Sequence, residues 1–191
     1  ELLFTAEEET SFHGAESING KLFKGHRVIN LDFSEDDKIV VGSCGGVGMK
    51  VKLLVQKERI VRENGKAWEI SITGMPGGHS GEDVNKGYGS AIQLMTRVLR
   101  QLLRQFDIGL VSLKGGSNRL ALASECKAVV LTYADLLPTL KKMQQIFINE
   151  YGEVTSDLEI SVKQVEIDGL KYSGDGFDRI MTLLTLFPDG I

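Results

Sequence analysis

The sequence has few cysteines and no long apolar run. Its 191 residues contain two cysteines, Cys44 and Cys126, which are too few for a disulfide framework and too far apart for a CxxC metal site. We therefore expect a reducing, cytoplasmic setting. No stretch approaches the roughly 18 consecutive apolar residues of a membrane-spanning helix, so no membrane partner is expected. Residues 1–4 lack the basic region of a signal peptide, and we expect none.

An excess of positive charge is also missing. The chain has 22 basic and 26 acidic residues and a net charge of −4, and it shows no basic stripe of the kind that binds nucleic acid. Hydrophobic residues make up 42% and charged residues 25%, which is typical of a folded globular chain and argues against general disorder.

The two ends of the sequence indicate a part of a longer protein. Residues 2–5 form an apolar run typical of the end of a buried strand, and the chain does not begin with Met. At the other end, a turn signal at residues 187–190 is followed by a single apolar residue, Ile191. A trimmed tag with loose tails is the alternative explanation. If segments are absent, a site built from distant parts of the parent chain is incomplete here.

Hydrophobic periodicity predicts a mixed α/β fold of the α+β kind. Alternating or apolar stretches predict strands over 27–33, 38–43, 49–60, 68–73, 108–113, 127–133 and 158–165. Asn64-Gly65 predicts a hairpin that joins the strands at 49–60 and 68–73. Apolar residues spaced three and four apart predict a helix over 87–105. A second helix is predicted to begin after a cap at Asp135, and a third is predicted over 177–186. From residue 68 onward, the order strand, helix, strand, strand, helix, strand is the split β-α-β order of ferredoxin-like sandwiches, with helices on one sheet face.

Three adjacent acids, Glu7-Glu8-Glu9, follow the first apolar run directly. Carboxylates at the end of a buried strand are costly unless a cation lies nearby. Neighbours in extended chain point to opposite sides, so one carboxylate can bind a metal while the next contacts a metal-bound water. The alternative is a helix N-terminus, where acids interact favourably with the helix dipole.

Asp32 lies within the apolar segment Ile29-Asn30-Leu31-Asp32-Phe33. A buried carboxylate needs a partner, and its hard oxygens suit Zn²⁺ or Mn²⁺. The alternative is an aspartate at the end of a strand that caps the following turn.

His79 is flanked by glycines in Gly77-Gly78-His79-Ser80-Gly81. Such glycines allow turns that lift the imidazole clear of a sheet, where it can donate a hydrogen bond to a developing oxyanion. A histidine in a glycine-rich loop is also common as simple surface decoration. His13 and His26 have no comparable setting, and we interpret them as ordinary surface residues.

These features, in this order, resemble the aminoacyl-histidine dipeptidases, which are co-catalytic zinc metallopeptidases related to aminoacylase and carnosinase. The resemblance runs over essentially the whole chain. It includes residues 4–10, Asn30-Leu31-Asp32, the approach at 72–74 to the His79 loop, Gly115-Gly116-Ser117 and the closing residues 184–190.

The resemblance implies a role for each candidate residue. Glu8 matches the general base, which moves a proton from the metal-bridging water to the leaving amine. Glu9 matches a ligand of one zinc ion and Asp32 a ligand of the other. His79 matches the lid-domain histidine that polarises the scissile carbonyl, in many relatives across a dimer. Residues 1–47 would then be a fragment of an α/β catalytic domain, and residues 48–191 a ferredoxin-like lid and dimerisation domain.

The chain departs from the family at several positions. The family usually has Asp-Glu-Glu where this chain has Glu7-Glu8-Glu9. A substrate-contacting Asn of the family is replaced by Leu120, which removes two donors and one acceptor. The family's Pro-Arg pair is replaced by Ala123-Ser124. These changes leave the substrate open.

Further metal ligands of the family, a His-x-Asp motif, a bridging Asp and a late His, lie outside this chain. We therefore expect the parent to be a zinc-dependent, homodimeric dipeptidase acting on Xaa-His dipeptides, and the chain alone to bind zinc weakly and to be inactive. Another acyl-amino-acid hydrolase or tripeptidase of the superfamily is the alternative enzyme. A dimerisation module without chemistry would explain the strand and helix order equally well.

Overall fold

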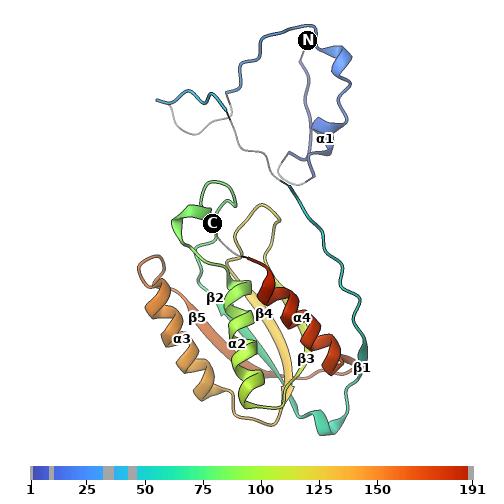
Figure 1. The fold of residues 1–191 in the computed structure, drawn as a ribbon, viewed down its shortest axis with the longest axis vertical. Coiled ribbons are helices and arrows are strands. Elements are labelled where there is room, and N and C mark those ends of the chain that lie inside the picture. Colours follow the sequence, from blue (N-terminus) through green and yellow to red (C-terminus); the bar gives the residue numbers. More distant parts are fainter. Residues whose placement is uncertain (1, 9–10, 32–36, 43–46, 189–191) are drawn as a thin grey trace. The chain divides into compact units, whose positions relative to one another are not determined.

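The computed structural model describes residues 2–8, 11–31, 37–42 and 47–188, and it divides the chain into two compact units. The first unit covers Glu1–Val51 and the second Lys52–Ile191. Figure 1 shows the helices and strands of both units. None of the described helices has both the length and the apolar character needed to cross a bilayer.

The first unit is mostly irregular in its described residues. It contains the short helix α1, His13–Glu16, and a 3₁₀ turn at Gly20–Leu22. The strands predicted over 27–33 and 38–43 are wrong for their described parts, 27–31 and 38–42, which pair with no other strand. Most apolar side chains there are almost fully exposed, for example Val28 at 90% and Val41 at 98%, and Val40 is exposed to 52%. A strand is stabilised by a ladder partner and a covered face, and the described residues of this unit supply neither.

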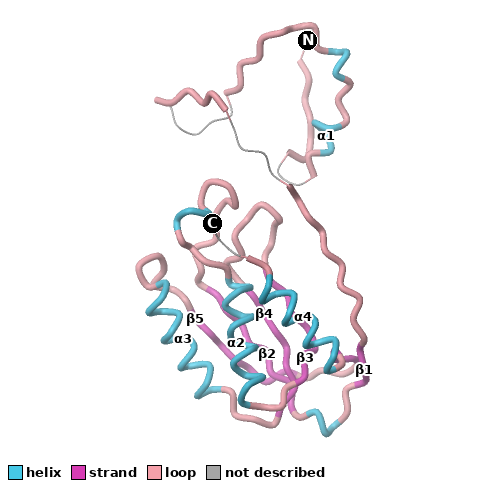
Figure 2. Tube along the Cα trace, viewed as in Figure 1, coloured by secondary structure: helices cyan, strands magenta, loops and turns pink. Residues whose placement is uncertain are grey.

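The second unit contains the predicted ferredoxin-like sandwich. Its elements are β2 Lys66–Thr73, α2 Ala91–Gln105, β3 Gly109–Gly115, β4 Cys126–Thr132, α3 Leu137–Tyr151 and β5 Glu159–Val165. The sheet is antiparallel in the order β3-β4-β2-β5. Helices α2, α3 and the additional α4, Gly174–Leu186, pack on one face of this sheet (Figures 1 and 2). The split β-α-β prediction is confirmed.

The central strand β2 shows why the sheet forms as it does. Ile70 and Ile72 are fully buried on the helix-covered face, and Ile70 lies opposite Ala128 of β4 and Val162 of β5. The intervening Glu69 points to the other face, where its carboxylate is 3.0 Å from Lys163 Nζ. The alternation of apolar and polar residues thus places one side of β2 in the core.

Helix α2 supplies the largest part of the core. Its fully buried side chains are Ala91, Met95, Val98, Leu99 and Leu102, with Leu94 at 1% exposure. The helix begins at Ala91, whereas the spacing predicted a start near Gly87. Gly87 and Gly89 have φ angles of 69° and 68°, a left-handed conformation that a right-handed helix does not contain.

The predicted hairpin at Asn64-Gly65 is wrong. Residues Arg62–Asn64 form a 3₁₀ turn, and the preceding strand is reduced to β1, Lys57–Arg59, which pairs with β6, Leu170–Tyr172, in a separate two-stranded sheet. Both edges of β2 are already occupied by β4 and β5, so no edge is left for a hairpin partner.

Helix α3 begins near the predicted cap and is tied to α2. Asp135 Oδ1 accepts a hydrogen bond from the Leu137 N–H at 3.1 Å. Arg97 of α2 stacks on the buried ring of Phe147 at 4.6 Å and forms two hydrogen bonds with the Glu150 carboxylate, at 2.6 and 2.7 Å. The bonds from Arg97 hold the pKa of Glu150 below its usual value. This pair is partly exposed, and its main effect is to fix how the two helices pack.

Candidate functional site

His79 lies in the loop between β2 and α2, and this loop pairs with the loop between β3 and β4. His79 and Ala121 form an isolated antiparallel bridge. The Ser80 N–H donates to the Leu120 carbonyl and the Leu122 N–H donates to the Gly78 carbonyl, both at 2.8 Å. The pairing joins the glycine-framed loop to the segment in which the chain departs from the family pattern.

The glycines before His79 are required by the backbone. Gly77 and Gly78 have φ angles of 71° and 124°, which side chains other than glycine rarely adopt. A Cβ atom at Gly78 would lie 2.6 Å from Oδ2 of Asp83, so there is no room for one. The expectation that glycines shape the backbone around this imidazole is therefore supported by the geometry.

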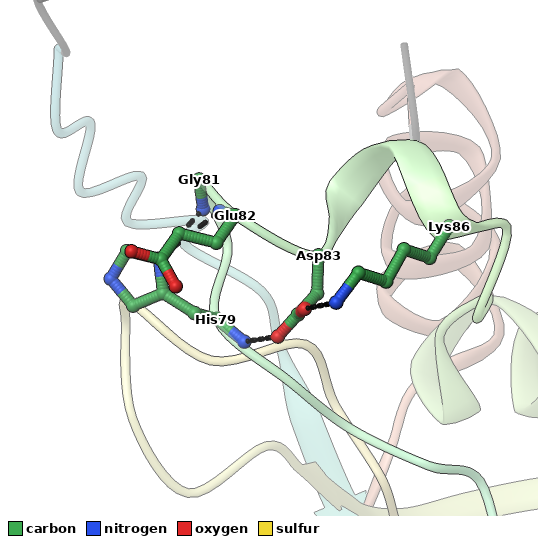
Figure 3. Close-up of polar contacts among 5 residues, drawn as sticks. All are labelled: His79, Gly81, Glu82, Asp83 and Lys86. Carbon is green, nitrogen blue, oxygen red and sulfur yellow. Dashed lines mark hydrogen bonds and ion pairs between the residues drawn. The ribbon is translucent and has the colours of Figure 1, made fainter. Parts of the chain in front are cut away.

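The imidazole of His79 is exposed, and one of its nitrogens is engaged. Nδ1 accepts hydrogen bonds from the N–H groups of Gly81, at 3.1 Å, and Glu82, at 3.2 Å (Figure 3). A nitrogen that accepts two hydrogen bonds carries no proton, so the proton of the neutral ring is on Nε2. Nε2–H is therefore the donor that this loop presents.

Two further residues, Asp83 and Lys86, belong to the hydrogen-bond network of this loop, and neither was predicted as a site residue. The His79 N–H donates to Asp83 Oδ2 at 2.6 Å, and Lys86 Nζ lies 2.6 Å from Asp83 Oδ1. The hydrogen bond from Lys86 and that from the His79 N–H hold the pKa of Asp83 below its usual value. The signal in the sequence is spacing alone: Asp83 follows His79 by four residues and Lys86 follows Asp83 by three.

Leu120, at the position where the family resemblance implies a substrate-contacting Asn, lies directly beside this loop. Its side chain is half-buried, its N–H donates to Asn118 Oδ1 at 3.0 Å, and its carbonyl accepts from Ser80. The position at which the resemblance implies a different residue thus lies next to the histidine loop.

The acidic candidates belong to the first unit. Glu8 is exposed in a turn. The preceding Glu7 has a φ of 64°, and its backbone carbonyl accepts a hydrogen bond from the Phe12 N–H at 2.9 Å. Helix α1 begins only at His13, so Glu7 and Glu8 are not in its first turn and the helix-dipole explanation does not apply to them. Glu9 and Asp32 lie outside the described residues.

Side chains that could bind a metal ion can be compared only among the described residues. Within 2–8, 11–31, 37–42 and 47–188, no group of three or more His, Cys, Asp or Glu side chains is positioned to bind a metal ion. Burial raises the pKa of the Cys126 thiol to about 12, so this cysteine is not a thiolate at neutral pH. The described side chains alone therefore do not form a zinc site.

Comparison with known proteins supports the resemblance drawn from the motifs. No family model matches the chain. The chain is 29% identical, over 195 aligned residues and its whole length, to the cytosol non-specific dipeptidase of Escherichia coli (strain K12). It also matches the crystal structure of the aminoacylhistidine dipeptidase from Vibrio alginolyticus, with a TM-score of 0.66 and 25% identity over 72% of the chain.

The chain spans only part of both relatives. It covers 40% of the length of the Escherichia coli dipeptidase and 29% of the Vibrio alginolyticus structure. A sequence match along the whole chain and a shared fold over most of it confirm the resemblance to this peptidase family.

Proposed function

We propose that this chain is part of a dipeptidase of the aminoacyl-histidine dipeptidase type, whose parent protein hydrolyses Xaa-His dipeptides. The observation that carries the proposal is the His79 loop, in which two amide hydrogen bonds to Nδ1 leave Nε2–H exposed as a donor. Similarity to a dipeptidase along the whole chain supports it. A binding module without chemistry would not explain why an exposed imidazole is held in one orientation.

His79 would act on the carbonyl oxygen of the scissile amide. As a nucleophile adds to the carbonyl carbon, negative charge develops on this oxygen, and Nε2–H donates a hydrogen bond to it. The donor is already oriented before substrate binds, so little reorganisation is needed when the charge forms.

Glu8 would act as the general base, which takes a proton from the attacking water and delivers it to the leaving amine. The family resemblance assigns Glu9 and Asp32 to a pair of zinc ions, which, when bound, would activate that water. Carboxylate oxygens are suitable zinc ligands, but each of these residues supplies only one of the roughly four ligands that a zinc ion needs. The chain alone would therefore bind zinc weakly and be inactive.

The two units would have different roles in the parent. Residues 1–47 would belong to the catalytic domain and residues 48–191 would form the lid and dimerisation domain. The exposed apolar side chains of the first unit, such as Ile29 at 86%, are consistent with a segment that packs against other parts of a larger domain. Among the described residues, strand β5 pairs with β2 on one side only, which leaves an edge for pairing with a second copy. We expect a cytoplasmic homodimer.

The experiment is a substrate panel with the purified full-length parent. We expect hydrolysis of Xaa-His dipeptides with the highest kcat/KM, measured by release of free histidine. Leu120 beside the His79 loop favours one specific alternative, a changed substrate. Turnover of tripeptides or N-acyl amino acids in place of dipeptides would establish that alternative, and no hydrolysis of any member would contradict the enzyme assignment.

A further inference from the structure

We infer that Asp83 is a positioning residue for His79. The carboxylate of Asp83 closes the turn that holds the His79 imidazole as the Nε2–H tautomer. The catalytic consequence rests on the proposed function, whereas the structural claim does not. Asp83 accepts a hydrogen bond from the backbone N–H of His79, so it can act on the ring through the loop.

The first step is the closure of the turn. The His79 N–H donates to Asp83 Oδ2 at 2.6 Å, and the Asp83 N–H donates to the His79 carbonyl at 2.9 Å. These reciprocal bonds hold the two ends of the turn together. The N–H groups of Gly81 and Glu82, which lie between the ends, are thereby directed at Nδ1 of the same histidine (Figure 3).

The second step is the choice of tautomer. A proton on Nδ1 would face two N–H donors, and both hydrogen bonds would be lost. With the proton on Nε2, both bonds form and the outward nitrogen is a donor. A substrate carbonyl oxygen only accepts hydrogen bonds, so the other tautomer would present a lone pair to it and could not stabilise the developing charge.

The third step is the fixing of Asp83 itself. Lys86 Nζ pairs with its second oxygen at 2.6 Å, and the side chain of Asp83 is 20% exposed. Gly78, which has no Cβ, leaves room for the carboxylate on the other side. The lowered pKa of Asp83 agrees with a carboxylate that stays charged at neutral pH. The Asp83 carboxylate is thus held by Lys86 on one oxygen and by the backbone N–H of His79 on the other.

The test is NMR on the ¹⁵N-labelled 191-residue chain at about pH 8.5, above the ordinary histidine pKa. The exposed His13 and His26 are internal references. In the wild type, we expect His79 ring-nitrogen shifts at the Nε2–H limit, distinct from the averaged shifts of the references, and slow exchange of the Gly81 and Glu82 amide protons. In Asp83→Ala, we expect the His79 shifts to move to the reference values and the amide protection to be lost.

Two further variants separate positioning from folding. Asp83→Asn keeps an oxygen acceptor for the His79 N–H, so it should retain the tautomer while Asp83→Ala does not. Asp168→Ala, which replaces an exposed aspartate in the loop between β5 and β6, should change nothing. Unchanged core signals, such as the Ile70 amide, show that the sandwich is intact.

The inference is overturned if His79 matches the reference histidines in the wild type, or if Asp83→Ala leaves the ring shifts and the amide protection unchanged. In the full-length parent, Asp83→Ala should lower kcat with little change in KM, and Asp83→Asn should recover most of the loss. A parent without peptidase activity would contradict the proposed function and leave the NMR result for Asp83 standing.

Discussion

Replacing His79 with alanine in the full-length parent is expected to lower kcat for dipeptide hydrolysis by about 10²–10³-fold, the usual loss when one oxyanion donor is removed. KM should change little, because the hydrogen bond from Nε2 strengthens mainly as charge develops on the carbonyl oxygen. The measurement is steady-state kinetics, together with light scattering to confirm unchanged assembly.

His26→Ala is the matched control, since His26 is also exposed and has no glycine-framed setting. It should retain wild-type kcat. Normal assembly with unchanged kinetics in His79→Ala would contradict the catalytic role and favour a binding or dimerisation module.

Replacing Leu99 with alanine is expected to lower the free energy of unfolding of the second unit by about 2–5 kcal/mol. Leu99 is fully buried on the sheet-facing side of α2, so the change removes buried methyl groups and leaves a cavity in the main core. Urea unfolding followed by circular dichroism measures the loss.

Leu103→Ala is the control on the same helix. Leu103 is only partly buried at the edge of this core, so the same chemical change should cost clearly less. Equal losses for the two variants would show that α2 does not present the apolar face described above.

The second unit was predictable because its elements are long and strongly periodic. The spacing of Leu99 and Leu102 identifies a helix face, and the alternation around Ile70 and Ile72 identifies a strand with one buried side. The order of these elements is that of a ferredoxin-like sheet, in which the two strands joined by each helix have one strand between them, as observed.

The errors have physical causes as well. Asn64-Gly65 is a strong local hairpin signal, but the pairing of β2 is decided by β4 and β5, which are distant in sequence. The predicted strand over 27–33 has the right composition, yet its described apolar side chains are largely exposed, Val28 at 90% among them. Sheet formation depends on partners that a local pattern does not contain.

The backbone geometry around His79 was predicted in part. The glycines around His79 predicted an unusual backbone there, because few residues other than glycine adopt positive φ angles. Asp83 was missed because a single aspartate four residues after a histidine is unremarkable in sequence, and only the folded turn brings its carboxylate to the His79 N–H. Glu9 and Asp32 lie outside the described residues, so their assignment remains a prediction.

The most direct test of the account is the zinc content of the full-length parent and its Glu9→Ala and Asp32→Ala variants, with calorimetric titration of the 191-residue chain alongside. We predict that the parent binds a pair of zinc ions per subunit, that each variant loses tight binding of one of them, and that the chain alone binds zinc only weakly. Full zinc content in both variants, or sub-micromolar stoichiometric binding by the chain alone, would contradict the account.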